Sequence, residues 1–221
     1  MLFRLLTKMG VPPRYIGNNW PGQHVTGLDT QYMDLSNLNL NGSIVQGWNG
    51  QSSDMYNINL RNSTISQAHL TGSYMDESKL SGARLHKIDL SRADLEMACL
   101  TATRASRVNY NFTDLFYATF QNALMLDCSF NYALLHHASF NRANMKICSL
   151  NGVQGRHIDF RGATLSHCDF RGSELSYLTL DDAVLDYVDF RGATIYNTDF
   201  SRASLQNTSL DNAKLVNCLR A

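Results

Sequence analysis

Every fifth residue along most of this chain is large and apolar. From Leu60 to Leu215, the positions numbered in multiples of five are all Leu, Phe, Ile, Met or Tyr, with two exceptions, Ala105 and Gly155. The residue two places before each of these centres is always Ala, Ser, Thr, Cys, Val, Ile or Leu, and Ala is the most frequent. The other three positions are mostly polar, no insertion or deletion breaks the phase, and a weaker form of it extends back to Leu35.

A five-residue period excludes a straight helix or strand as the repeating element. A helix repeats about every 3.6 residues and a strand about every two, so neither places every fifth residue on one face. A chain that turns a corner every five residues does so, and four corners close a square coil of about 20 residues. The large centre and the small residue before it then point inward, and the coils stack through backbone hydrogen bonds about 4.8 Å apart.

Several quintets carry a recognisable motif. A-D-L-E-M (93–97), A-T-L-S-H (163–167) and A-S-L-Q-N (203–207) resemble the A-(D/N)-L-x-x motif of pentapeptide-repeat proteins. The resemblance implies an all-β fold, a right-handed quadrilateral parallel β-helix solenoid, over residues 28–218. At the strand spacing this gives a rod about 45 Å long. Residues 45–50 (Val-Gln-Gly-Trp-Asn-Gly) keep the count but lose the pattern, so we expect a distorted coil or loop around residues 45–57.

Both ends of such a rod expose strand edges that need a cover. In the N-terminal segment, residues 1–27, five apolar residues are expected to form a short helical cap that stops at Pro12-Pro13: Leu2, Phe3, Leu5, Leu6 and Met9. At the other end the phase runs out after Leu215, and residues 219–221 form a short tail without a capping helix. We expect that end to meet a second copy in a homodimer, a partner or an adjacent domain, unless the chain is a fragment.

A coil of this length predicts that residues one coil apart stack on one face. All seven phenylalanines at centre positions fall on two opposite faces: Phe120, Phe130, Phe140, Phe160, Phe170, Phe190 and Phe200. Beyond residue 60, six glycines come two residues after centres whose numbers end in zero, which favours type II turns there: Gly72, Gly82, Gly152, Gly162, Gly172 and Gly192. The alternate corners, with Arg107, Tyr117, His137 or Tyr187 at that position, are expected to avoid positive φ.

The cysteines offer two interpretations. Cys128, Cys148 and Cys168 are one coil apart and form an inward ladder at the small-residue position. They suggest a redox or metal site, or small hydrophobes between Val108 and Val188 on the same face, and we favour the second. Five cysteines without a C-x-x-C pair argue against a disulfide scaffold or zinc module and fit a reducing compartment.

Aspartate recurs immediately before the centre residue, where it could suggest acid–base chemistry. The seven positions are Asp89, Asp94, Asp114, Asp159, Asp169, Asp189 and Asp199. A repeat favours a simpler role, because a short carboxylate beside a turn accepts hydrogen bonds from nearby backbone. The chain contains no G-x-S-x-G, G-x-x-x-x-G-K-S/T or H-E-x-x-H motif. We therefore predict no enzyme activity, no cofactor and no metal site.

One outward corner gathers aromatic, His and Arg side chains in columns one coil apart. Its members are Phe116, Tyr117, His136, His137, Arg156, His157, Tyr177 and Tyr196. Protein interfaces concentrate aromatic residues and Arg, so this strip is the candidate surface for a protein partner. The alternative is that stacked rings only cover the coil edges. A metal held by His137 and His157 is not favoured, since two ligands are too few.

Charge and hydropathy exclude some classes of protein and indicate the cellular compartment. The 19 Lys and Arg residues balance 19 Asp and Glu residues, which excludes a strongly basic nucleic-acid binder. No apolar run approaches the length of a membrane span, and the start, MLFRLLTKMG, lacks the features of a secretory signal. We expect a protein of the bacterial cytoplasm, the bacterial origin being implied by the resemblance.

Two functions compete. The first is a non-catalytic bacterial scaffold for protein–protein interaction, as a separate protein or as the β-helix of a secreted effector delivered into a host cell. The alternative comes from the resemblance, because some pentapeptide-repeat proteins are DNA-shaped inhibitors of DNA gyrase that confer quinolone tolerance. Zero net charge, the absence of a C-terminal dimerisation helix, and Arg161, Arg171 and Arg191 among the Asp residues disfavour it. Direct nucleic-acid binding is not expected.

Overall fold

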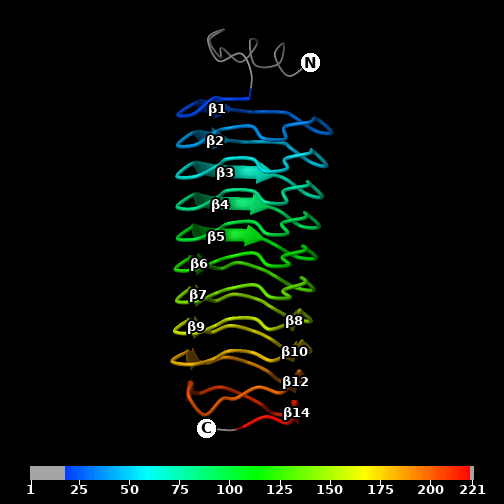
Figure 1. Cartoon of the computed structure of the whole chain (residues 1–221), viewed down its shortest axis with the longest axis vertical. Coiled ribbons are helices and arrows are strands. Elements are labelled where there is room, and N and C mark those ends of the chain that lie inside the picture. Colours follow the sequence, from blue (N-terminus) through cyan, green and yellow to red (C-terminus); the bar gives the residue numbers. More distant parts are fainter. Residues whose placement is uncertain (1–17, 220–221) are drawn as a thin grey trace.

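The computed structural model describes residues 18–219, which form one parallel β-solenoid of stacked coils (Figure 1). One side is a ten-stranded parallel sheet of β1 (His24–Thr26), β2 (Ile44–Gln46), β3 (Thr64–His69), β4 (Arg84–Asp89), β5 (Arg104–Asn109), β6 (Leu124–Leu126), β7 (Asn144–Lys146), β9 (Thr164–Ser166), β11 (Val184–Asp186) and β13 (Ser204–Gln206). The opposite side carries a four-stranded sheet of β8 (Gln154–Arg156), β10 (Glu174–Ser176), β12 (Thr194–Tyr196) and β14 (Lys214–Val216).

The strand pairs confirm the predicted coil length. Val25 pairs with Val45 and Leu185 with Leu205, in each case one predicted coil further along the chain. Backbone hydrogen bonds between strands join each coil to its neighbours, so every strand is held by residues one coil away in the sequence. No helix in the described part of the chain is long and apolar enough to cross a bilayer.

The solenoid is slightly longer than the sequence predicted. Asn19 already bridges Asn39, so the coils begin before residue 28, and Leu219 bridges Asp199, just beyond the expected end at 218. The early residues lack the A-(D/N)-L-x-x motif, but backbone pairing does not depend on it. The predicted cap at Leu2, Phe3, Leu5, Leu6 and Met9 lies outside the described residues.

The interior follows the predicted inward pattern. Leu95, Phe120 and Ala163 are all fully buried. Rings on the same side stack face to face, as Phe120 does on Phe140 with centroids 4.8 Å apart. Rings on opposite sides meet edge to face, as Phe120 does with Phe130 at 5.8 Å. Both geometries are favourable for aromatic pairs and add to the burial of their apolar area.

The corners correct one expectation. Positive φ is found at both kinds of corner, including those predicted to avoid it: φ is 54° at Arg107, 56° at Tyr117, 59° at His137 and 52° at Tyr187. The corner has one geometry that the stacking of coils imposes, so side chains that disfavour it must still adopt it. Asn, which tolerates this left-handed conformation better than most residues, occupies several of these corners, among them Asn57.

The distortion expected around residues 45–57 is absent. Val45 is fully buried and pairs with Ile65, in the same arrangement as the coils around it. The pattern is lost there because the large and small positions exchange: buried Trp48 fills the interior where Gly50 has no side chain. A Cβ at Gly50 would lie 3.1 Å from the Trp48 Nε1 atom. That indole nitrogen donates a hydrogen bond of 2.9 Å to Thr30 Oγ1.

Candidate functional site

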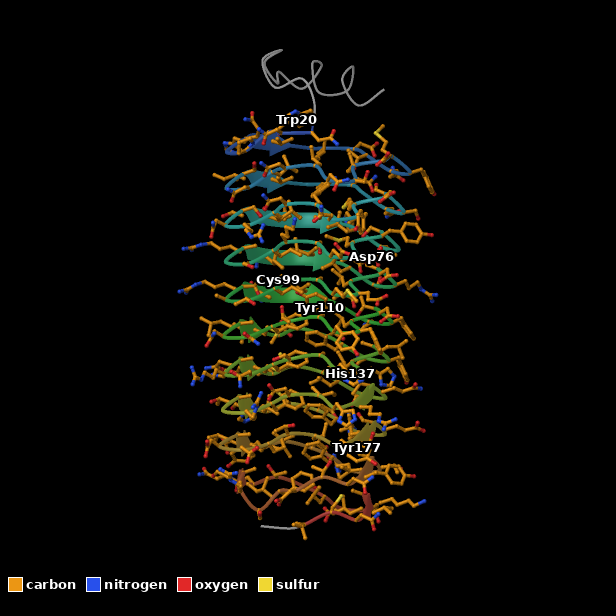
Figure 2. All side chains as sticks on the ribbon, in the orientation of Figure 1. Trp20, Asp76, Cys99, Tyr110, His137 and Tyr177 are labelled. Atoms are coloured by element: carbon orange, nitrogen blue, oxygen red, sulfur yellow. The ribbon has the colours of Figure 1, made fainter. Side chains whose placement is uncertain are left out.

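Four rings form a continuous stack on the side of the four-stranded sheet. Tyr117, His137, His157 and Tyr177 follow one another with centroid separations of 4.8, 5.1 and 4.8 Å and interplanar angles of 21°, 25° and 24°. We call these four residues the ring ladder. Each occupies the left-handed corner position of its coil, and the coil spacing sets the distance between rings. Figure 2 shows His137 and Tyr177 along this side of the rod.

The structure adds three of the other predicted strip residues to the ladder. The Phe116 ring meets Tyr117 edge to face at 4.5 Å, and the Arg156 guanidinium lies 5.2 Å from the centroid of Tyr177. The Arg156 amide donates a hydrogen bond of 3.2 Å to His136 Nδ1. Tyr196 is exposed and makes no ring contact with the aromatic residues of the described range.

The electrostatics of the ladder favour a neutral histidine. Partial desolvation by neighbouring side chains, the nearby Arg156 guanidinium and His137 together lower the pKa of His157. Among residues 18–219 no group of three or more His, Cys, Asp or Glu side chains is placed to hold a metal. The ladder can therefore offer ring faces, edges and hydrogen-bonding nitrogens, which suit contact with a protein surface.

Carboxylates extend the same side of the rod toward the N-terminal end. They flank the centres from Leu35 to Leu115 and include Asp34, Asp54, Asp76, Glu77, Asp94, Glu96 and Asp114. We call these seven residues the acidic strip. No Lys or Arg occurs among residues 34–37, 54–57, 74–77, 94–97 or 114–117. Sequence reasoning missed this strip, although writing the charges in columns one coil apart would have revealed it.

Within the acidic strip two carboxyl groups interact. Burial, together with a hydrogen bond to Asp94 and the charge of that residue, raises the pKa of Asp76 to about 7. The protonated form of Asp76 is therefore favoured below about pH 7, because two like charges so close together disfavour each other. Figure 2 places Asp76 on the same side of the rod as His137 and Tyr177.

The seven recurring aspartates have the structural role that the sequence favoured. In each case Oδ1 accepts a hydrogen bond from the backbone N–H two residues later, as Asp94 does from Glu96 at 3.1 Å and Asp114 from Phe116 at 3.0 Å. Arg161 also pairs with Asp159 at 2.7 Å, and Arg171 and Arg191 make the same pair with their own aspartates. The main role of these carboxylates is therefore to accept hydrogen bonds from the backbone of the turns.

The cysteines differ in environment. Cys128, Cys148 and Cys168 are buried, and the hydrogen bond to Cys148 and burial raise the pKa of Cys128 far above its ordinary value. Cys99 is half-buried and lies 3.1 Å from the Ser81 hydroxyl. Although burial opposes it, hydrogen bonds with hydroxyl groups lower the pKa of Cys99 to about 7. No signal in the sequence indicated this, because Ser81 and Thr119 come from neighbouring coils.

Comparison with solved structures supports the fold. HetL, a pentapeptide repeat protein involved in heterocyst differentiation regulation from the cyanobacterium Nostoc sp. strain PCC 7120, has a TM-score of 0.63 and 19% identity, covering 96% of this chain and 92% of HetL. Trypsin-treated QnrB1, a plasmid-mediated fluoroquinolone resistance protein, has a TM-score of 0.46 and 17% identity, covering 88% of this chain and 92% of QnrB1. At 19% identity the likeness to HetL concerns the fold alone.

Family comparison completes the assignment. A family model described as "Pentapeptide repeat region" matches residues 123–200. A second family model, described as "Pentapeptide repeats (8 copies)", matches residues 53–92, 68–104 and 183–219. No curated protein sequence matches the chain. The two family matches together cover more than half of the 221 residues. With the solenoid and its inward quintet pattern, they show that this chain belongs to the pentapeptide-repeat family.

Proposed function

We propose that this protein is a non-catalytic scaffold that binds a partner protein through the ring ladder and its flanking residues. The observation that carries the proposal is the exposed, pre-ordered stack: Tyr117 and Tyr177 remain 46% and 41% exposed although both rings are already packed on histidines. A surface whose aromatic side chains are fixed before binding loses little rotamer freedom in the complex. Aromatic and Arg side chains are also the usual anchors of protein interfaces.

The surroundings of the ladder support a binding role over a catalytic one. The recurring aspartates accept backbone hydrogen bonds, and three of the five cysteines are buried in the core. All five cysteines are free, which agrees with a scaffold that works in a reducing compartment such as the bacterial cytoplasm.

A strip variant tests this proposal. Replacing Tyr117, His137 and Tyr177 with Ser removes three of the four rings, and we expect it to abolish recovery of the partner from cell lysate in a quantitative pull-down. The matched control replaces Phe112 and Tyr132, an exposed stack on another corner with centroids 5.2 Å apart, with Ser. Equal recovery by both variants would contradict the proposal, and thermal melting establishes that both are folded.

A second candidate function has one specific observation in its favour. The acidic strip presents seven carboxylates without an intervening Lys or Arg, as a mimic of duplex DNA would. Basic residues elsewhere neutralise this charge in the whole protein, so the strip would have to act alone. A gyrase supercoiling assay decides it: inhibition that disappears in the Asp54→Asn, Asp94→Asn, Asp114→Asn variant would favour gyrase, and unchanged supercoiling would exclude it.

A further inference from the structure

The outer face of the ten-stranded sheet carries a cluster of cations on the side opposite the ring ladder. Over β4 to β7 the outward side chains include Arg84, Lys87, Arg104, Arg107 and Lys146, and all five are exposed. We call this the basic face. Asp127 is the one carboxylate among residues 84–87, 104–107, 124–127 and 144–147, and its Oδ2 lies 3.5 Å from Arg107 Nε.

Two of these cations differ from the three arginines that are paired within their own coil. Arg161, Arg171 and Arg191 are each held at 2.7 Å by an aspartate two residues earlier in the same coil. Within residues 18–219, Arg84 and Arg104 have no carboxylate within ion-pair distance. Their charges are therefore uncompensated by the protein and available to an anionic partner.

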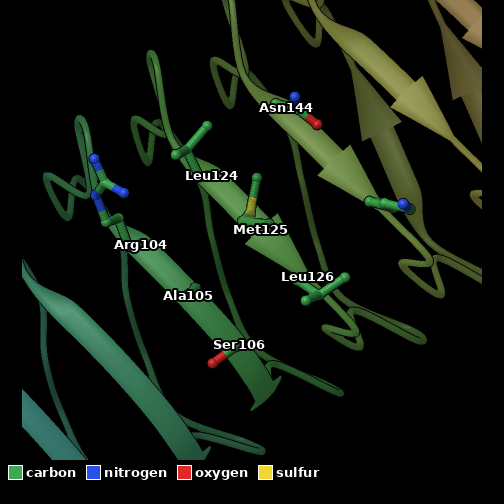
Figure 3. Close-up of a pocket in the computed structure, with 8 residues that line it drawn as sticks. Arg104, Ala105, Ser106, Leu124, Met125, Leu126 and Asn144 are labelled. Carbon is green, nitrogen blue, oxygen red and sulfur yellow. The ribbon is translucent and has the colours of Figure 1, made fainter.

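A hollow lies in the middle of this face, across β5, β6 and β7 (Figure 3). It has a volume of about 360 Å³ and is lined by Arg104, Ser106, Leu124, Leu126 and Lys146 among others. Ser106 contributes a short side chain to this lining. The neighbouring residues in the same column, His86 and Leu126, are longer, and His86 Nδ1 lies 2.8 Å from Ser106 Oγ.

The sides of the hollow are apolar, whereas its two ends are charged. Leu124 and Leu126 are 43% and 47% exposed, and Ile147 on the next coil is 53% exposed. A second hollow of about 530 Å³ adjoins the first and shares Ser106 and Leu126 with it. Exposed apolar side chains around a depression, with unpaired cations on both sides, are the complement of an acidic segment that carries a bulky apolar residue.

We propose that the basic face binds an acidic peptide segment of a partner protein. A bulky apolar side chain of the segment enters the hollow between Leu124 and Leu126, and flanking carboxylates pair with Arg104 and Lys146. A membrane surface suits this face less well, because the leucines line a depression instead of projecting as a flat patch. Single-stranded nucleic acid suits it less well too, because the face offers no Phe, Tyr or Trp among residues 84–87, 104–107, 124–127 and 144–147 for base stacking.

This inference goes beyond the ring-ladder proposal and does not depend on it. The two surfaces lie on opposite sides of a rod that both sheets make rigid, so both can be occupied at once. A protein with two such sites would hold two partners at a fixed separation. Binding at the basic face should therefore change in variants of that face and stay the same in variants of the ladder.

Fluorescence anisotropy with a labelled peptide tests the site. The probe is a Glu-rich peptide with a central Leu-Phe pair, which we expect to bind the wild-type protein and to bind less tightly as salt concentration rises. Replacing both Arg84 and Arg104 with Ser, or filling the hollow with Ser106→Leu, should weaken binding about tenfold or more. The control Arg161→Ser with Arg171→Ser, and the triple ladder variant, should bind like wild type.

Several results would overturn the proposal. One is a peptide with Lys in place of Glu, or Ser in place of the Leu-Phe pair, that binds as tightly as the probe. Others are absence of probe binding by a folded wild-type protein, or binding that the two basic-face variants leave unchanged. Vesicles rich in phosphatidylserine that bind through Arg84 and Arg104 while the peptide does not would assign the face to membranes. Sedimentation showing that the same residues drive self-association would assign it to a second copy.

Discussion

The imidazole rings of His137 and His157 stack with centroids 5.1 Å apart and planes inclined by 25°. Two protonated rings in this arrangement would repel each other, and the Arg156 guanidinium adds a third positive charge beside them. Partial desolvation and these charges lower the pKa of His157, so the neutral ring is favoured in the folded protein. Its contribution to stability is present above the unfolded pKa and is lost as pH falls through the folded pKa.

We therefore predict that acid lowers the melting temperature partly through His157. His157→Phe keeps a ring in the ladder but cannot be protonated, so its melting temperature should fall less than that of the wild type between about pH 7 and pH 5. Calorimetry at several pH values measures the difference, and an NMR titration should give a His157 pKa below its ordinary value. Parallel curves for the two proteins would contradict the prediction.

Asp76 predicts the opposite dependence on pH. Burial and the Asp94 carboxyl raise its pKa to about 7, so the protonated acid is favoured in the folded state. The associated stability is present below the unfolded pKa and is lost as pH rises through about 7. Asp76→Asn should melt above the wild type at about pH 8 and close to it at about pH 4. Asp34→Asn, at the more exposed end of the strip, serves as the control and should not reproduce this pattern.

Tyr110 predicts a stabilising substitution. It is fully buried and stacks on Phe130 with centroids 4.6 Å apart, but its hydroxyl has no hydrogen-bond partner in the described structure. An unsatisfied buried polar group costs about 1–3 kcal/mol. Tyr110→Phe should raise the free energy of unfolding by an amount in this range, measured by chemical denaturation. A loss of stability would show that the hydroxyl has a partner, such as an ordered water molecule.

Cys99 should be the first cysteine to react with a thiol reagent. Its pKa is lowered to about 7 despite burial, because hydroxyl groups including those of Ser81 and Thr101 stabilise the thiolate. The thiolate is the nucleophile, so iodoacetamide at neutral pH should modify Cys99 well before buried Cys128. Ser81→Ala should slow the reaction by raising this pKa, as peptide mass spectrometry can follow. Preferential modification of Cys128 would contradict the prediction.

The sequence was sufficient for the fold because the repeat encodes it locally and redundantly. Phe120, Ala163 and Leu95 each obey the same rule, so a single exception such as Gly155 does not alter the prediction. The sequence pattern predicted a distortion at Trp48 and Gly50 because it treats each position separately. In the structure the large Trp48 side chain fills the space that Gly50 leaves, so the interior of the coil stays filled. The backbone conformation at Tyr117 or His137 was also missed, because it is imposed by coil stacking and not by the residue itself.

The ring ladder could be proposed from spacing alone, since residues one coil apart must be neighbours in a solenoid. The pKa of Asp76, by contrast, depends on how deeply one carboxyl is buried beside another in the next coil. The hollow across β5, β6 and β7 depends on how side chains of three neighbouring coils pack together. Such details are set by side-chain packing, and the five-residue pattern carries no information about them.

Because each coil pairs only with the coils before and after it, the rod has no central element on which the rest depends. Duplication of the coding sequence for one whole coil would lengthen the molecule and leave the conformation of every other coil unchanged. A gain or loss of a single residue would instead shift all later side chains between interior and solvent. This architecture can therefore evolve by the gain or loss of whole coils, and each such event changes the separation between surfaces along the rod by the same distance.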